Sequence, residues 1–352
     1  MTPDIDPATR AAIDDAIDEA MARIRGRADR LGESFTALAD ALARAMAGGK
    51  RFRPALVAAS FHAFAGRADT CPALFPVAAA FELLHGAFVV HDDVIDHDVM
   101  RRGSPNVSGE FRARGAERGA GEAAAADLGN AAAILGGDLL LYEATRFIAL
   151  AEVPRSRRDR LLELFDDAVI VSAAGELADV ENALIAATSD PIELLETAYD
   201  KTAVYSFAAP LGGGAVLAGA TDAELDALRD SGGRLGLAYQ LVDDLIGAFG
   251  SREQAGREPG SDLREAKSTP LIALARESEA WHKVSSTLAV AHTGPIAVLH
   301  AQRALDASGA RERLCALIDE TLDSARVAAR PLPERVRALV DDIAARILER
   351  IP

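Results

Sequence analysis

Residues 81–98 read FELLHGAFVVHDDVIDHD, an apolar run that ends in a cluster of carboxylates. The run up to Val90 contains no helix breaker except Gly86, so the sequence predicts a buried helix here. On a helix, Asp92 and Asp96 lie one turn apart on the same face. Carboxylates crowded in this way repel one another, and Mg²⁺ relieves this repulsion while it binds substrate phosphates. An exposed acidic helix end would give the same pattern, so a metal site needs further support.

The composition indicates an all-α protein with a large core. Hydrophobic residues make up 49% of the 352 residues, aromatic residues make up only 5%, and alanine is abundant. Runs of β-branched residues are few, which favours closely packed helices. The length allows two domains, although large single-domain helical folds also reach this size.

Helical periodicity and end signals divide the chain into long helices joined by short connections. We expect helices over about residues 7–31, 34–47, 54–64, 72–99, 129–151, 156–187, 190–201, 202–218, 222–249, 267–278, 295–306, 310–328 and 333–349. Short connections favour one large bundle, so residues 1–352 are expected to form a single domain. Residues 103–126 lack clear periodicity and are predicted to be a mobile loop or lid, with a disordered insert as the alternative.

Charge and hydropathy predict a cytoplasmic protein. The formal net charge of -16 argues against nucleic acid or an anionic membrane as a partner, because both require a basic surface. The two cysteines, Cys71 and Cys315, give no disulfide framework and no metal-ligand spacing. The first residues lack the apolar segment of a signal peptide, and we expect no apolar run of about 18 residues that could span a membrane.

A second acidic motif, YQLVDDLIG at residues 239–247, repeats the context of the first. Asp243 and Asp244 again follow apolar residues near the end of a long predicted helix. Two such helices facing each other across a bundle would place carboxylates on opposite walls of one cavity. A chance repeat is the alternative, since the chain has 54 acidic residues.

Basic residues near these motifs predict binding of diphosphates. In GGKRFRP, residues 48–54, a glycine turn leads into a helix whose first N–H groups favour an anion, and Lys50 and Arg53 add donors. Arg101 and Arg102 follow the first motif, and Lys267 follows the second. Each group alone could be a solvated surface. Together they favour two diphosphates, one bound through Mg²⁺ and one mainly through lysine and arginine.

The motifs resemble those of the trans-isoprenyl diphosphate synthases, or polyprenyl synthetases, of the short-chain type that makes geranylgeranyl or farnesyl diphosphate. They occur in the family's order over nearly the whole chain, as GGKRFRP, ELLHGAFVVHDDVIDHDVMRRG, GDLLL, GELADV, YDKTAVYSF, YQLVDDLIGAFG and GSDLREAKST. The resemblance implies an all-α bundle around a deep central cavity, a homodimer, and head-to-tail condensation of isopentenyl diphosphate with an allylic prenyl diphosphate. The allylic C–O bond would break to release diphosphate, which would itself accept the proton lost after condensation.

The resemblance also assigns roles to individual residues. The residues assigned to binding of isopentenyl diphosphate are Lys50, Arg53, His85 and Arg102. The residues assigned to the allylic diphosphate are Arg101, Lys201, Gln240 and Lys267, and Arg257 is assigned to substrate binding. About three Mg²⁺ ions per active site would be held mainly by Asp92, Asp96 and Asp243, with Asp93, Asp244 and Asp262 in support. The carbonyl of Lys201 and the hydroxyl of Thr202 would face the developing carbocation.

The chain departs from the family pattern at three positions. Gly247 stands where the second motif often has a third aspartate, Glu176 where glutamine is common, and Arg257 where lysine is common. A weakened third metal site is one consequence of Gly247, whereas Arg257 keeps the charge and changes its geometry.

Product length should depend on Phe88 and Ala87, about one turn before Asp92, where the growing tail must pass. An aromatic floor at Phe88 favours a product of about 15 to 20 carbons, and geranylgeranyl diphosphate over farnesyl diphosphate.

Several further residues have open interpretations. His91 is expected to support the metal carboxylates instead of acting as a base, and His97 and Asp98 are expected to face solvent. Tyr205, Phe207 and Tyr239 could line the cavity or belong to the core. Three alternative functions remain: a long-chain synthase, a terpene cyclase that needs no isopentenyl site, and a non-catalytic partner subunit.

Overall fold

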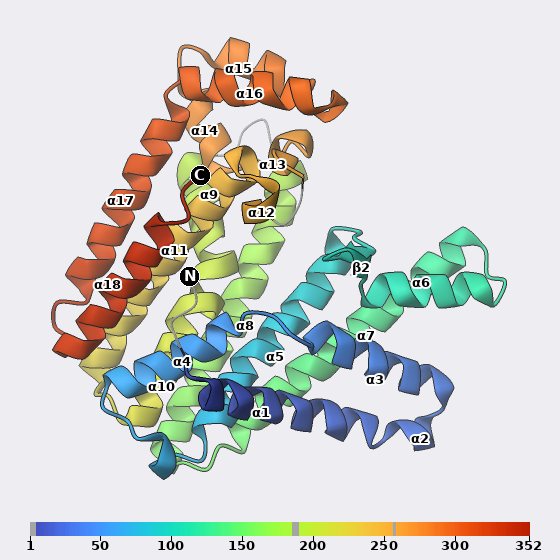
Figure 1. The fold of residues 1–352 in the computed structure, drawn as a ribbon, viewed down its shortest axis with the longest axis vertical. Coiled ribbons are helices and arrows are strands. Elements are labelled where there is room, and N and C mark those ends of the chain that lie inside the picture. Colours follow the sequence, from blue (N-terminus) through green and yellow to red (C-terminus); the bar gives the residue numbers. More distant parts are fainter. Residues whose placement is uncertain (1–4, 185–189, 256–257) are drawn as a thin grey trace. The chain divides into compact units, whose positions relative to one another are not determined.

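The computed structural model describes residues 5–184, 190–255 and 258–352, and helices dominate it (Figure 1). The all-α prediction is therefore confirmed. The described residues group into two compact units. The amino-terminal unit contains residues up to 165 together with 213–219, and the carboxy-terminal unit contains residues 166–212 and 220–352. Helices α8 and α10 pass from one unit into the other, and the assignment of the chain to a single domain stays a prediction.

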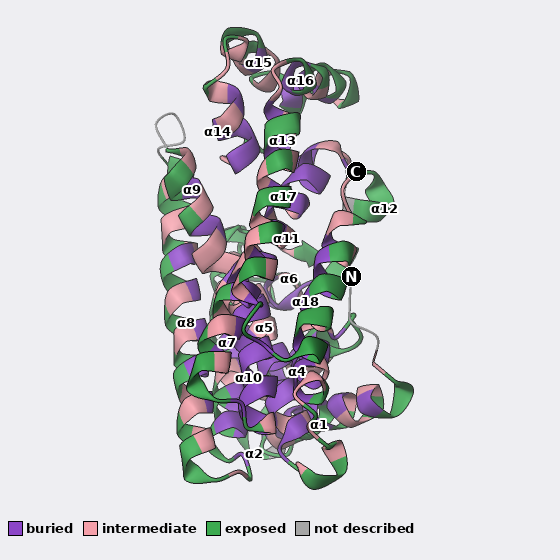
Figure 2. Ribbon diagram, turned by 90° about the vertical axis from the view of Figure 1, so that its left-hand side faces the viewer, coloured by how far each residue is buried: buried purple, intermediate pink, exposed green. Residues whose placement is uncertain are grey.

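The amino-terminal unit is built around helix α5, which carries the first acidic motif. Its elements are α1 (Pro7–Arg25), α2 (Ala28–Leu31), α3 (Glu33–Met46), α4 (Phe52–Ala63), the 3₁₀ helix η1 (Ala68–Thr70), α5 (Leu74–Ile95), β1 (Met100–Arg101), β2 (Ser104–Pro105), α6 (Val107–Glu117), α7 (Glu122–Ala149) and parts of α8 (Arg155–Leu184) and α10 (Ala209–Ala218). Helix α5 packs against α1, α4 and α7. Phe81, Leu83 and Leu84 are fully buried, and buried residues of α4 and α5 are purple in Figure 2.

Helix α6 corrects the prediction of a loop over residues 103–126. Asn106 caps the helix by accepting a hydrogen bond from the N–H of Gly109 at 2.8 Å. The helix buries Val107 and Phe111 and packs against α7, which begins at Glu122. The many glycines and alanines hid this periodicity, because small buried residues look the same as loop residues in a hydropathy pattern. Mobility of this segment stays a prediction.

The carboxy-terminal unit is built around helix α11, which carries the second acidic motif. Its elements are the rest of α8 and α10, α9 (Pro191–Ala198), the π-helix η2 (Tyr199–Ala208), α11 (Asp222–Phe249), α12 (Arg252–Ala255), α13 (Ser261–Arg264), α14 (Pro270–Arg276), α15 (Trp281–Leu288), the 3₁₀ helix η3 (Ala291–Thr293), α16 (Pro295–Ala307), α17 (Ala310–Ala328) and α18 (Glu334–Leu348). Helix α11 packs against η2, α17 and α18. A capping box formed by Thr221 and Glu224 fixes its first turn.

Two helices are long and apolar enough to cross a membrane by length and composition, α5 and α7. The expectation that no run would reach this length is therefore wrong. Of the most apolar 18-residue window, 61% is buried in α5 and 39% in α7. A core helix of a soluble protein passes the same test, so the burial of α5 accounts for its apolar character, and the absence of a membrane span stays a prediction.

Candidate functional site

The first acidic motif lies at the C-terminal end of α5. Asp92 is half-buried, Asp93 is buried, and Asp96 is exposed and caps the helix. Asp92 and Asp96 are four residues apart at the end of the helix, and their shared role in binding a metal ion stays a prediction. His97 and Asp98 are exposed, so their expected position is confirmed.

The short hairpin after α5 returns Arg101 to the acidic motif. Arg101 donates from Nε and Nη2 to Oδ1 of Asp93, at 2.9 and 2.7 Å, and its Nη2 lies 3.7 Å from Oδ2 of Asp92. Burial raises the pKa of Asp93, and the guanidinium of Arg101 opposes that rise. The structure therefore places Asp93 against an arginine, and its predicted role as a supporting metal ligand stays a prediction.

Four predicted diphosphate ligands form one basic cluster in this unit: Arg53, His85, Arg101 and Arg102. Burial lowers the pKa of His85 well below its usual range, and the positive charges of Arg53, Arg101 and Arg102 lower it further. The charges of the three arginines reach His85, so the four residues form a basic cluster with a neutral imidazole. Arg102 has a left-handed backbone with φ of 52°, which is unfavourable for a side chain and here turns the hairpin.

The GGKRFRP loop enters α4 through a left-handed turn at Gly48 and Gly49, with φ of 71° and 84°. Lys50 is exposed at the end of this turn. Arg51, which sequence reasoning missed, is buried and points the other way. Its guanidinium donates to Asp14 Oδ1 at 2.7 Å, to Glu82 Oε1 at 3.3 Å and to the carbonyl of Met46 at 3.0 Å. Arg51 thus anchors the loop that presents Lys50 and Arg53.

His91 does not support the acidic motif as expected. Its Nε2 lies 3.2 Å from the carbonyl oxygen of Ile134 and 3.4 Å from Oδ1 of Asp138, both on α7. The helical rotation of about 100° between adjacent residues turns His91 away from the side chain of Asp92. The imidazole therefore ties α5 to α7.

In the carboxy-terminal unit, the π-helix η2 positions Lys201 and Thr202. A Cβ on Gly175 of α8 would overlap the backbone of Asp200 and Lys201, so glycine is required for this close approach. Lys201 Nζ bonds to Glu176 at 3.0 Å and to Asp179 Oδ2 at 2.7 Å. Thr202 Oγ1 donates to Oε1 of Gln240 at 3.1 Å. Glu176, one of the departures from the family pattern, therefore contacts the predicted ligand Lys201 directly.

Helix α11 gathers acidic groups around its C-terminal half. Gln240 Nε2 donates to Asp244 Oδ1 at 3.0 Å. Burial raises the pKa of Asp244 to about 8, the hydrogen bond from Gln240 opposes this, and the charges of Asp262, Asp243 and Asp179 add to it. Asp244 therefore holds a proton at neutral pH, and a bound cation would displace it.

Lys267, another predicted ligand, lies near this acidic group. Lys267 is exposed, with Nζ 3.4 Å from Glu265 and 4.0 Å from Asp262. Arg257 lies outside the described residues.

Phe207 is fully buried and packs against Tyr239 at 5.3 Å between ring centroids, which is a core contact. In the amino-terminal unit, Ala87 is buried and Phe88 is half-buried.

Sequence reasoning also missed Arg350, which follows α18. Its Nη2 forms an ion pair with Oδ1 of Asp243, 107 residues earlier in the chain. No spacing or periodicity connects the two residues, so no signal in the sequence could have revealed this contact.

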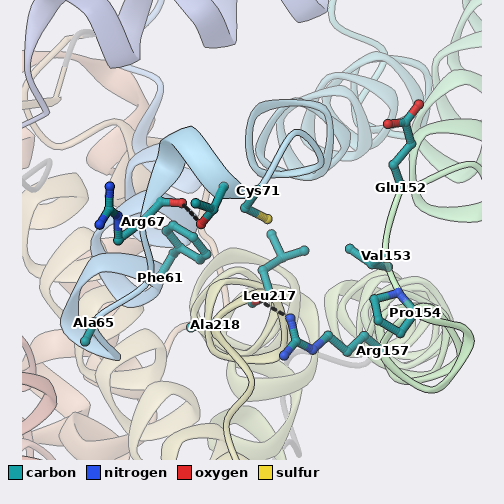
Figure 3. A pocket seen from close by; sticks show the side chains of 12 residues that line it. Phe61, Ala65, Arg67, Cys71, Glu152, Val153, Pro154, Arg157, Leu217 and Ala218 are labelled. Carbon is teal, nitrogen blue, oxygen red and sulfur yellow. Dashed lines mark hydrogen bonds between the residues drawn. The ribbon is translucent and has the colours of Figure 1, made fainter.

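A separate cavity of about 330 Å³ lies in the amino-terminal unit (Figure 3). Arg157 donates there to the carbonyl of Leu217 at 3.0 Å, and Thr70 to that of Arg67 at 2.8 Å. None of the predicted site residues that the structure describes lines this cavity.

The donor set of the two acidic motifs fits Mg²⁺. Carboxylate oxygens are the hard ligands that this ion takes, and it completes its shell with water and phosphate oxygens. Within the described part of the chain, no three acidic, histidine or cysteine side chains already converge on one ion-sized site. An ion bound at either motif would therefore depend on phosphate ligands as well as on protein carboxylates.

Comparison with known proteins agrees with these motifs. Residues 35–300 match the family model described as polyprenyl synthetase. The chain is 32% identical over 232 residues to a geranylgeranyl diphosphate synthase of Sulfolobus acidocaldarius, covering 64% of this chain and 62% of that protein. It is 34% identical over 237 residues to an octaprenyl diphosphate synthase of Haemophilus influenzae, covering 66% of this chain and 63% of that protein. The chain thus spans less than two thirds of the length of these relatives.

A solved structure supports the same relationship. A geranylgeranyl pyrophosphate synthase from Corynebacterium glutamicum, complexed with isoprenyl diphosphate and magnesium, has a TM-score of 0.88 and 27% identity. The similarity covers 99% of this chain and 100% of that chain.

Proposed function

The chain belongs to the polyprenyl synthetase family, and we propose that it is a Mg²⁺-dependent prenyltransferase. In this proposal it condenses isopentenyl diphosphate head-to-tail with an allylic diphosphate, which is dimethylallyl, geranyl or farnesyl diphosphate, and releases diphosphate. The observation that carries the proposal is the basic cluster in the same unit as the first acidic motif. Its members Arg53, His85 and Arg102 would form part of an isopentenyl site, which a terpene cyclase would not need.

Three members of the basic cluster, Arg53, His85 and Arg102, would bind isopentenyl diphosphate together with Lys50. Arg53 and Arg102 offer planar donor pairs that match phosphate oxygens. The imidazole of His85 is neutral, so it would donate one hydrogen bond without adding charge. The buried anchor at Arg51 would keep the loop in place when the anion binds.

The acidic motifs would hold the allylic diphosphate through about three Mg²⁺ ions, which stabilise negative charge on the leaving group. Asp92, Asp96 and Asp243 are the proposed principal ligands, with Asp93, Asp244 and Asp262 in support. The same diphosphate would be bound by Arg101, Lys201, Gln240 and Lys267, and Arg257 is proposed as a further substrate-binding residue.

Lys201 would exchange its bonds to Glu176 and Asp179 for phosphate oxygens. The Lys201 carbonyl and the Thr202 hydroxyl would face the allylic cation. The π-helix supports this role, because such segments distort the ladder of backbone hydrogen bonds and occur often at functional sites.

The proposed product is geranylgeranyl diphosphate. The relatives include synthases of this product and of octaprenyl diphosphate, so family membership does not decide the length. Phe88 lies on the face of α5 that carries Asp92, one turn, or about 6 Å, before it. An aromatic side chain there would stop the growing tail, which favours a short product over a long-chain one.

Two rows of exposed apolar residues support the proposal of a homodimer. Helix α7 exposes Leu128, Leu135 and Tyr142, and α8 exposes Ile170, Leu177 and Leu184. Both rows repeat every seven residues, the spacing at which helices pack along one another. Uncovered rows of this kind mark contact surfaces. We place the dimer in the cytoplasm, in keeping with its free cysteines and acidic charge.

One incubation tests the reaction. The chain is mixed with labelled isopentenyl diphosphate and each of the three allylic diphosphates, with Mg²⁺ and then with EDTA, and the products are separated by chromatography. Formation of longer prenyl diphosphates only with Mg²⁺ supports the proposal. Formation of cyclic hydrocarbons without use of isopentenyl diphosphate would contradict it.

A further inference from the structure

Arg350 covers one face of helix α11 in the carboxy-terminal unit. Its Nη2 forms the ion pair with Oδ1 of Asp243, and its guanidinium carbon lies 4.2 Å from the centre of the Tyr239 ring. Tyr239 and Asp243 are one helical turn apart, so a single arginine contacts two successive residues of the same face. The stacking contact fixes the plane of the guanidinium beside the carboxylate.

The backbone around Arg350 is also held. Gln254 Nε2 lies 3.5 Å from the carbonyl oxygen of Arg350, and Arg311 Nη2 donates to that of Pro352 at 2.5 Å. Arg311 in turn stacks over Phe249, the last residue of α11, at 4.5 Å. The residues after α18 are therefore fixed to the end of α11 that carries the acidic motif.

The second arm of the guanidinium has nothing to bind within the described part of the chain. Nη1 is buried and has no hydrogen-bond partner there, whereas Nη2 holds Asp243. A buried donor without an acceptor is unfavourable, and a charged one more so. The two arms of a guanidinium suit planar recognition of carboxylate and phosphate oxygens. The unsatisfied arm thus indicates an anion as its partner.

We propose that Arg350 completes the diphosphate site of the second acidic motif. One arm orients the carboxylate of Asp243 for a divalent ion, as outer partners of metal ligands commonly do. The other arm donates to an oxygen of the diphosphate that the ion binds. The inference rests on the proposed function, because Asp243 is a metal ligand there, and it adds a binding residue that lies outside every motif of the sequence.

Binding of Mg²⁺ with inorganic diphosphate, measured calorimetrically on the full chain, tests the role of Arg350. Arg350→Met should weaken binding by about 10-fold to 100-fold, the usual effect of losing an outer partner of a metal ligand. Arg350→Lys should recover part of the affinity because it keeps the charge. Arg335→Met, at an exposed position of α18, is the matched control and should bind as the original chain does. Thermal unfolding without ligand checks that each variant is folded.

Asp243→Asn separates the two levels of the proposal. If this variant loses binding but Arg350→Met binds as tightly as the original chain, the role of Arg350 is refuted while the metal site stands. Tighter binding by Arg350→Met would refute it as well, because the arginine would then compete with the ion. If Asp243→Asn leaves binding unchanged, the metal role of Asp243 fails and the inference fails with it.

Discussion

The carboxylate of Asp262 fills the space beside Gly247, where a Cβ would overlap its Oδ2. Asp262 is buried on the short helix α13, and its charge is one of those that raise the pKa of Asp244. A negative group therefore stands next to position 247 although the second acidic motif has no third aspartate. The departure at Gly247 is coupled to the placement of Asp262.

Gly247→Ala should destabilise the protein by about 1–3 kcal/mol, the usual effect of overpacking a well-filled site. Thermal unfolding measures the loss. Gly121→Ala is the control, because a Cβ there meets no atom within 4 Å. If both variants unfold at the same temperature, Asp262 does not occupy the space beside position 247. The pair Gly247→Asp with Asp262→Gly should recover stability lost in Gly247→Asp alone, since only one carboxylate then remains.

Asp244 should make the protein without ligands less stable as the pH rises. Its pKa is about 8 when folded and 3.8 in the reference state, so the folded chain holds the extra proton between these values. The free energy of unfolding therefore falls as pH increases through this range. Asp244→Asn mimics the protonated form and should lack this component. Chemical denaturation of both proteins at pH 5, 7 and 9, with EDTA present to remove metal ions, measures this change. Equal slopes of the free energy of unfolding against pH for the two proteins would refute the assignment.

Arg51→Met should be strongly destabilising. It would leave Glu82 buried without its positive partner, and breaking a buried pair costs about 3–5 kcal/mol. Arg155→Met is the control, because Arg155 and Asp159 form an exposed pair on α8, and such pairs contribute about 0–1 kcal/mol. Chemical denaturation compares the two. Equal losses would show that Arg51 does not anchor the loop.

Arg102→Ala should raise the KM for isopentenyl diphosphate by about 10-fold or more, because hydrogen bonds to charged groups contribute about 1.5–3 kcal/mol. The KM for the allylic diphosphate should change little. Arg112→Ala removes an arginine from an exposed pair on α6 and should leave both constants unchanged. A terpene cyclase would keep its turnover after the Arg102 change, and such a result would reject the proposed condensation.

Phe88→Ala should lengthen the product, because it removes the aromatic ring one turn before Asp92. Chromatography of the prenyl products measures the change. Phe64→Ala, a change of the same half-buried residue type beyond the end of α4, should leave the length unaltered. Unchanged products from Phe88→Ala would show that another residue limits the tail.

Most helices could be predicted because their signals are local. The predicted helix over 222–249 is α11, and Thr221 and Glu224 form a capping box at its start. The loop expected at 103–126 was wrong because α6 is stabilised by packing against α7, which no local pattern records. The acidic and basic motifs could be recognised by residue type.

Contacts between distant residues could not be predicted. Arg350 and Asp243 meet only through the packing of α18 on α11, and Arg51 is recognisable as an anchor only once Asp14 and Glu82 are near it. The direction of His91 was also wrong, because adjacent residues on a helix diverge.

The π-helix η2 also limits how this part of the chain can change in length. An α-helix turns by about 100° per residue and the wider π-helix by somewhat less, so the loss of one residue from Tyr199–Ala208 would rotate all side chains on one side of the gap by roughly a quarter turn. Either Lys201 would leave Glu176 and Asp179, or Phe207 would leave the core. A substitution in this segment changes one side chain at a time. The deletion of one residue would displace either the candidate binding residue or the core residue, because the two are held in one register.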